Sequence, residues 1–128
     1  MDKVDAFWMG NVGGKTKHLW VVISDTKKHN GCGVIVNISK NKKRTREECP
    51  LAAGEHPELD EPTSWVCYCD ATLQTPNGWA EIQKGIPKFI KPAVKCPPAC
   101  LAKIIAGAKV SAGKPDGAFR TDYLPYLD

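Results

Sequence analysis

Two short runs of β-branched and aromatic residues, with a tight-turn signal between them, constrain the fold of this chain more than any other feature. The runs are His18–Ser24 and Gly33–Ser39. Side chains of these types fit a pleated, half-buried surface and are enriched in strands. Asn30-Gly31 lies between the runs and supplies residues that tolerate positive φ. We therefore predict two antiparallel core strands joined by residues 25–32.

A third core strand is predicted over Ser64–Leu73, because the side chains there alternate in a strand pattern. The segment before it reads as an exposed loop. That segment opens with the basic run Lys40–Arg46 and continues with six acidic residues between Glu47 and Glu61. Proline and glycine residues punctuate it, at Pro50, Gly54, Pro57 and Pro62.

The clearest helix signal begins at Cys96 and ends by residue 112. Pro97 suits the first helical position, and apolar residues follow with the spacing of one buried helix face, at Leu101, Ile104, Ile105 and Ala108. Residues 74–95 have no clear pattern: Thr75-Pro-Asn-Gly78 indicates a turn, and Trp79–Lys84 fits either one helical turn or an edge strand. The tail Tyr123–Tyr126 is expected to dock on the core with little regular structure.

Length and composition favour one globular domain over residues 1–128, mainly β with a C-terminal helix. Of the 128 residues, 42% are hydrophobic and 25% are charged. The longest apolar run, Leu19–Ile23, is too short to cross a bilayer. Residues Met1–Asn11 lack the basic start and apolar stretch of a secretion signal. We therefore expect a cytoplasmic location and no membrane partner.

Six cysteines would suit a disulfide framework in a secreted chain, but without an export signal we expect reduced thiols. They are Cys32, Cys49, Cys67, Cys69, Cys96 and Cys100. Neither the C-x-C nor the C-x-x-x-C spacing is that of a C-x-x-C zinc knuckle. Buried thiols that act as small apolar side chains explain the cysteines more simply, so no metal or other cofactor is expected. A zinc-stabilised interaction domain remains an alternative.

The net charge of +4 is unevenly distributed. Residues 1–73 carry ten basic and ten acidic side chains, whereas residues 74–128 carry eight basic and four acidic ones. The positive excess therefore lies in the last part of the chain. Such a bias is compatible with a polyanionic partner such as RNA.

Four short motifs follow one another along the chain, at His18–Asp25, Val34–Ser39, Gly54–Pro57 and Ser64–Tyr68. In this order they resemble the PemK/MazF-like toxin family of type II toxin–antitoxin systems. The resemblance covers roughly residues 17–73 and implies a small SH3-like β-barrel against which the helix over 96–112 packs. It also implies an antitoxin protein as partner, and homodimers are common in the family.

The resemblance further implies a metal-independent endoribonuclease that cleaves single-stranded RNA. The RNA 2′-hydroxyl attacks the neighbouring phosphate and leaves a cyclic phosphate and a free 5′-hydroxyl. This reaction needs a base, an acid and donors for the charge that develops on the phosphate. Where the family has Arg-Pro and Thr, this chain has Lys17, His18 and Ser39. Histidine exchanges protons near neutral pH, whereas lysine holds a phosphate as a point charge without the bidentate fork of arginine.

The remaining site candidates depend on how the loops converge. His56 and Ser64 complete an acid–base pair if the fold brings the loop and the strand ends together. Four cations of the basic run then form a track for the RNA backbone: Lys42, Lys43, Arg44 and Arg46. The alternative to each role is structural, with histidines and serines that bond local backbone groups and a solvated basic loop. The alternative function is a non-catalytic SH3-like module that binds RNA or a protein peptide.

Overall fold

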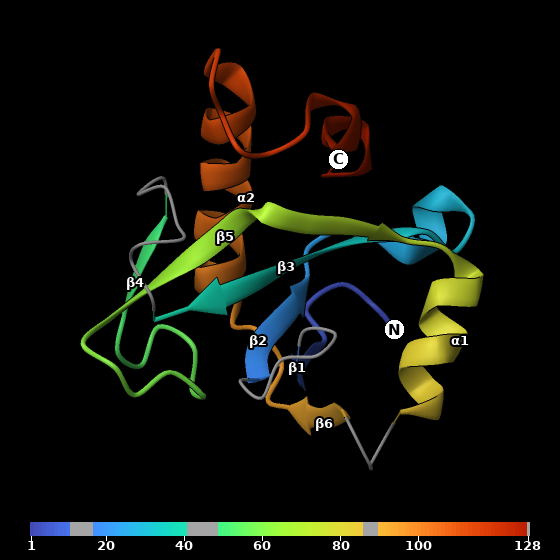
Figure 1. Ribbon diagram of the computed structural model, residues 1–128, viewed down its shortest axis with the longest axis horizontal. Helices are drawn as coiled ribbons and strands as arrows, with labels where there is room; N and C mark the ends of the chain where they lie inside the picture. Colours follow the sequence, from blue (N-terminus) through green and yellow to red (C-terminus); the bar gives the residue numbers. More distant parts are fainter. Residues whose placement is uncertain (11–16, 41–48, 86–89, 128) are drawn as a thin grey trace.

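The computed structural model describes residues 1–10, 17–40, 49–85 and 90–127 and shows a mixed α+β fold built on one antiparallel sheet. Its six strands lie in the order β4-β5-β3-β2-β1-β6 (Figure 1). The strands are β1 (Ala6–Gly10), β2 (Lys17–Val22), β3 (Gly33–Ser39), β4 (Pro50–Ala52), β5 (Thr63–Gln74) and β6 (Ile90–Ala93). The helices are α1 (Pro76–Lys84) and α2 (Pro98–Gly113), with 3₁₀ turns at Thr26–His29 and Thr121–Leu127.

The predicted hairpin of β2 and β3 is confirmed and forms the centre of the sheet. Leu19 lies opposite Ile38, and Val22 lies opposite Ile35. Asn30 and Gly31 have φ values of 55° and 83°, so the turn uses the left-handed backbone that these residue types tolerate. β5 then pairs with β3, so the three strands with the clearest sequence signals are neighbours.

The sheet carries an apolar cluster on each face because its side chains alternate. Leu19 and Val21 join a larger cluster with Ile104 of α2, and the C-terminal 3₁₀ turn covers the same face. Trp20 and Val22 point the other way, into a smaller cluster that α1 closes. In Figure 1, α2 and the C-terminus accordingly lie on one side of the sheet, and α1 lies at its far end.

One expectation is not shown and two are corrected. In the described residues the sheet is open, with β4 and β6 at its edges, so the small SH3-like barrel implied by the resemblance is not shown. The segment predicted as an exposed loop contains β4 and buries Leu51 and Leu59 against the core. Thr75 is the N-cap of α1 rather than part of a turn, because its hydroxyl accepts the N–H of Gly78 and Pro76 occupies the first helical turn.

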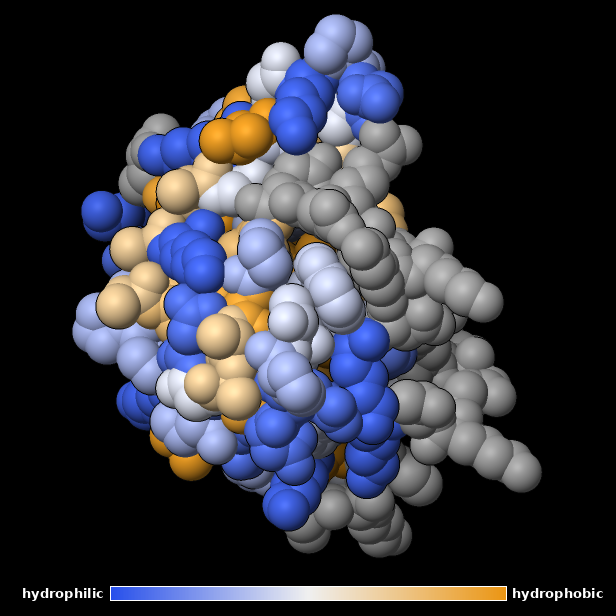
Figure 2. Space-filling view, turned by 90° about the vertical axis from the view of Figure 1, so that its left-hand side faces the viewer, coloured by the Kyte–Doolittle hydropathy of each residue, from blue (hydrophilic) through white to orange (hydrophobic). Residues whose placement is uncertain are grey.

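Elsewhere the surface is mixed in character. The face shown in Figure 2 has hydrophilic and apolar side chains interspersed. Among the large apolar residues of the described chain, only Val94 and Val110 are exposed, at 53% and 55%. Neither described helix combines the length and the apolar character that crossing a bilayer requires.

Candidate functional site

A pocket of about 330 Å³ opens at the end of the sheet where β2 begins, β3 ends and β5 begins. One wall, here called the strand-end wall, comprises Lys17, His18, Ser39, Lys40 and Ser64. Four of these five were predicted from the sequence. The antiparallel pairing explains why they meet, since it joins the start of β2 to the end of β3 and the end of β3 to the start of β5.

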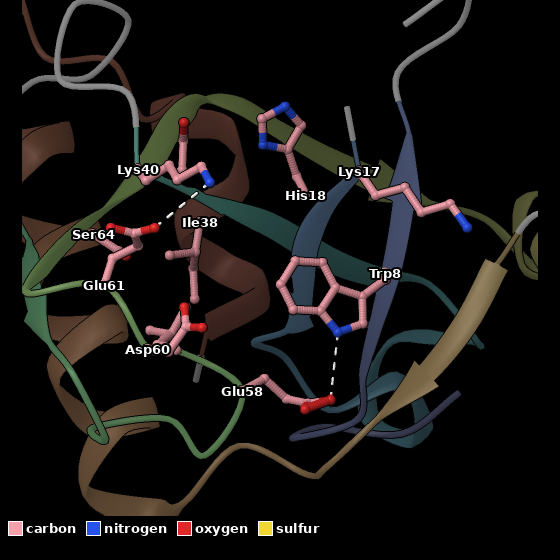
Figure 3. A pocket seen from close by; sticks show the side chains of 11 residues that line it. Trp8, Lys17, His18, Ile38, Lys40, Glu58, Asp60, Glu61 and Ser64 are labelled. Carbon is pink, nitrogen blue, oxygen red and sulfur yellow. Dashed lines mark hydrogen bonds and ion pairs between the residues drawn. The ribbon is translucent and has the colours of Figure 1, made fainter. Parts of the chain in front are cut away.

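The side chains of this wall differ in how far they face the pocket. Ser39 and Ser64 are almost fully buried, at 6% and 3% exposure. Figure 3 shows the Lys17 ammonium pointing away from Ser64, whereas the Lys40 ammonium points toward Glu61, which lies beside Ser64. In the same view the imidazole of His18 lies above the ring of Trp8. The wall therefore holds one lysine ammonium and one imidazole near the two buried hydroxyls.

Three carboxylates also line the pocket and are here called the acidic wall: Glu58, Asp60 and Glu61. Glu58 accepts a hydrogen bond from the indole Nε1 of Trp8 at 3.4 Å. Glu61 lies 3.6 Å from the ammonium of Lys40. Both partners of that ion pair are well exposed, so it adds little to stability. Cationic and acidic side chains are therefore mixed around the pocket, with Lys40 beside Glu61.

The acidic wall and Trp8 are site residues that were not predicted from the sequence. The carboxylates belong to the stretch that we interpreted as an exposed loop, and the signal for their position was the pair of apolar residues, Leu51 and Leu59, that tie the stretch to the core. Trp8 lies in β1, a five-residue strand without a clear pattern of its own.

His56 does not line the pocket, so the predicted acid–base pair with Ser64 is not assembled. Its side chain is fully buried, and its Nδ1 accepts the backbone N–H of Glu58 at 3.0 Å. Burial lowers the pKa of His56, and the carbonyl of Val94 and the charge of Glu58 offset only part of the effect. Nε2 makes no well-formed hydrogen bond to any described residue. The imidazole therefore holds the acidic wall in shape.

The proposed RNA track lies beyond the described residues. Lys42, Lys43, Arg44 and Arg46 all fall in the segment 41–48, so the structure gives no position for them. Lys40, the residue at the rim of the pocket, leads directly into that segment.

The cysteines form no disulfide bonds. Cys49, Cys67, Cys96 and Cys100 are buried, whereas Cys69 is exposed and Cys32 is half-buried. Burial raises the pKa of Cys49, which keeps this thiol protonated and unreactive. Within residues 1–10, 17–40, 49–85 and 90–127, no three histidine, cysteine or acidic side chains are arranged to hold a metal ion.

Comparisons with known proteins found no matching family model, no matching curated protein and no matching solved structure. The function must therefore be argued from the chemistry of the pocket. That chemistry combines an imidazole, lysine ammonium groups, two buried hydroxyls and three carboxylates.

Proposed function

We propose that the pocket binds single-stranded RNA and that the protein is a metal-independent endoribonuclease of the PemK/MazF toxin type. One observation carries this proposal. Lys17, His18, Ser39 and Ser64 come from three strands and line the same pocket. Lys17, His18 and Ser39 stand where the family has its Arg-Pro pair and its Thr, and Ser64 begins the last of the four matching motifs.

The reaction needs two proton transfers on opposite sides of the phosphate. A base removes the proton of the 2′-hydroxyl as its oxygen attacks phosphorus, and an acid protonates the departing 5′-oxygen. The acidic wall offers carboxylates for the first transfer, and the imidazole of His18 is the candidate group for the second. Lys40 and the hydroxyls of Ser39 and Ser64 face the negative charge that develops between them.

Cleavage of single-stranded RNA in the presence of EDTA tests the proposal. The wild-type chain should produce fragments with cyclic phosphate and 5′-hydroxyl ends. His18→Ala should lower the rate by about a hundredfold or more, the usual contribution of a positioned acid or base. Lys17→Ala should reduce the rate less, because its ammonium points away from Ser64.

Lys84→Ala is the matched control for the loss of a lysine. Lys84 lies on α1 and pairs only with exposed Glu81 among the described residues, so its removal should leave cleavage unchanged. Circular dichroism of each variant checks that the fold is retained. A His18→Ala protein that cuts RNA as fast as the wild type would exclude this mechanism.

A second candidate function is a module that binds RNA or a peptide without cleaving it. Lys17 and His18 favour it, because they replace the Arg-Pro pair of the family and lysine lacks the bidentate grip of arginine. Tight RNA binding with no cleavage by the wild type would support this function instead of the first.

Assignment to the toxin family has further consequences for partners, assembly, fold and location. An antitoxin protein would cover the pocket, and a homodimer is the expected assembly. The open sheet would be a variant of the family's SH3-like barrel. RNA as substrate and the lack of disulfide bonds among the six cysteines both fit a cytoplasmic location.

A further inference from the structure

Two of the buried cysteines lie beside each other at the start of α2. Cys96 precedes the helix by two residues, and Cys100 is the third residue of its first turn. Both belong to the larger core cluster, and each is 3% exposed. Their side chains share a hydrogen bond. Two thiols in such close contact have the arrangement from which a disulfide bond forms, because the bond requires that the two residues already be neighbours.

The residues between the two thiols hold them close together. Pro97 and Pro98 are two of the three intervening residues, and a proline ring fixes φ at each of these positions. Pro97 is the N-cap of α2, with a φ of −60°, and Pro98 begins the helix. The backbone N–H of Cys96 donates to the carbonyl of Val4 at 2.8 Å, which anchors this end of the segment. Little conformational freedom would therefore be lost if a bond joined the two sulfur atoms.

The two thiols differ in chemical character. Cys100 accepts the hydrogen bond from Cys96, and this bond lowers the pKa of the Cys100 thiol. The same bond, together with burial, raises the pKa of Cys96. Cys100 also lies in the first turn of α2, where the helix dipole favours a negative charge. Because the thiolate is the reactive form of cysteine, Cys100 is the better nucleophile of the two.

We infer that Cys96 and Cys100 are a redox modification site, at which a peroxide converts the two thiols into a reversible disulfide bond. The Cys100 thiolate attacks one oxygen of hydrogen peroxide and becomes a sulfenic acid as the O–O bond breaks. The departing hydroxide takes up the proton that Cys100 lost and forms water. The sulfur of Cys96 then attacks that of Cys100, the S–S bond forms, the S–O bond breaks, and a second water leaves with the proton of Cys96. Both sulfurs are oxidised, and the peroxide is reduced to water.

The position of the pair in the fold suits such a reaction. Exposed residues flank it on both sides: Lys95, Pro98 and Ala99. A small peroxide therefore needs only the first turn of α2 to open, and helix ends fray more readily than the middle of an element. The alternative is that the two thiols only fill space in the core, in which case they stay reduced as long as the chain is folded.

Treatment of the folded full chain with one equivalent of hydrogen peroxide tests the site. Trypsin cleaves after Lys95 and Lys103, so both thiols fall within the peptide 96–103. After the remaining free thiols are blocked with iodoacetamide, we expect this peptide to be unblocked and two hydrogen atoms lighter in mass spectrometry. Dithiothreitol should restore both thiols. Cys69→Ser is the matched control, because it removes the one exposed thiol among the six cysteines and should leave the result unchanged.

Single substitutions test the order of attack. Dimedone labels sulfenic acids, so it reports which sulfur reacts with the peroxide first. In Cys96→Ser we expect a label on Cys100, and in Cys100→Ser we expect Cys96 to remain unlabelled. Circular dichroism checks that both variants keep their fold. A label on Cys96 in the second variant, with none on Cys100 in the first, would overturn the roles given to the two thiols.

The wild-type chain alone can also overturn the inference. A peptide 96–103 that keeps both thiols reduced after peroxide treatment would do so. A disulfide that forms only after unfolding in urea would show that the folded chain does not present the pair. A bridge from Cys100 to Cys49, the thiol nearby on the other side, would assign the reaction to a different pair. None of these outcomes bears on the proposed ribonuclease, because the two cysteines do not line its pocket.

Discussion

The environment of His56 makes the stability of the protein depend on pH. Burial lowers the pKa of this imidazole from its ordinary value of 6.5. The unfolded chain therefore binds a proton at a pH where the folded chain does not. Stability rises with pH wherever the unfolded state holds more protons. We thus expect the free energy of unfolding to decrease as the pH falls below about 6.5, the ordinary histidine value, and through the lower pKa of the folded state.

The test compares urea unfolding at about pH 7.5 and about pH 5, on either side of the histidine range. His56→Asn keeps an acceptor for the N–H of Glu58 but cannot take up a proton, so its stability should change less between the two values. His56→Leu removes the acceptor and should cost about 1–3 kcal/mol even at the higher pH. A His56→Asn protein with the full pH dependence of the wild type would show that other groups cause it.

At the scale of the elements, α2 and β5 are held together at a point where only glycine fits. The hydroxyl of Tyr68 donates to the carbonyl of Ile104 at 2.6 Å. A Cβ atom on Gly107 would collide with that hydroxyl and lie 3.0 Å from the Cβ of Cys49. The small residue therefore lets the helix approach the strand closely enough for this buried hydrogen bond to form.

Gly107→Ala should consequently destabilise the protein, although alanine usually stabilises a helix interior. We expect a loss of about 1–3 kcal/mol in the free energy of unfolding, as for other overpacked sites. Gly113→Ala is the matched control, because nothing lies within 4 Å of a Cβ there. It should be neutral or stabilise by up to about 1 kcal/mol. Equal effects of the two substitutions in thermal unfolding would contradict this account of the contact.

The strands and the helix that were predictable from the sequence are those with a clear pattern of apolar residues within their own segment. β3 has the predicted bounds, and β2, β5 and α2 differ from the predicted bounds by one or two residues at each end. β4 and β6 have only three and four residues, and β6 contains Pro92. Such short segments become strands because a neighbouring strand offers hydrogen bonds, which a local pattern does not reveal.

The same distinction applies to the site. Lys17, His18, Ser39 and Ser64 were predictable because they lie at the ends of three strands that the sequence pattern predicts. Trp8 and Asp60 were not, since their positions depend on a weakly patterned strand and on a loop. That loop is anchored by buried Leu59 and His56, and nothing in its acidic, proline-rich composition indicates this packing.

For the molecule as a whole, charge distribution sets how RNA binding should respond to salt. The net charge is +4, but three carboxylates line the pocket and one of them, Glu61, pairs with Lys40. Each phosphate that a lysine neutralises on single-stranded RNA contributes about −0.7 to the slope of log K against log salt concentration. The described pocket offers few lysine–phosphate contacts. Binding in the pocket should therefore contribute only a small part of the salt dependence of log K.

The contribution of each pocket lysine can be isolated by fluorescence anisotropy with labelled single-stranded RNA at several salt concentrations. Lys40→Ala should make the slope shallower by about 0.7, the value for one phosphate contact. Lys84→Ala removes the same charge from a residue of α1 that does not line the pocket. This variant should have the same slope as the wild type. Since both variants lower the net charge equally, a difference between them reports on location alone. An identical decrease in both would mean that RNA responds to the overall charge and does not enter the pocket.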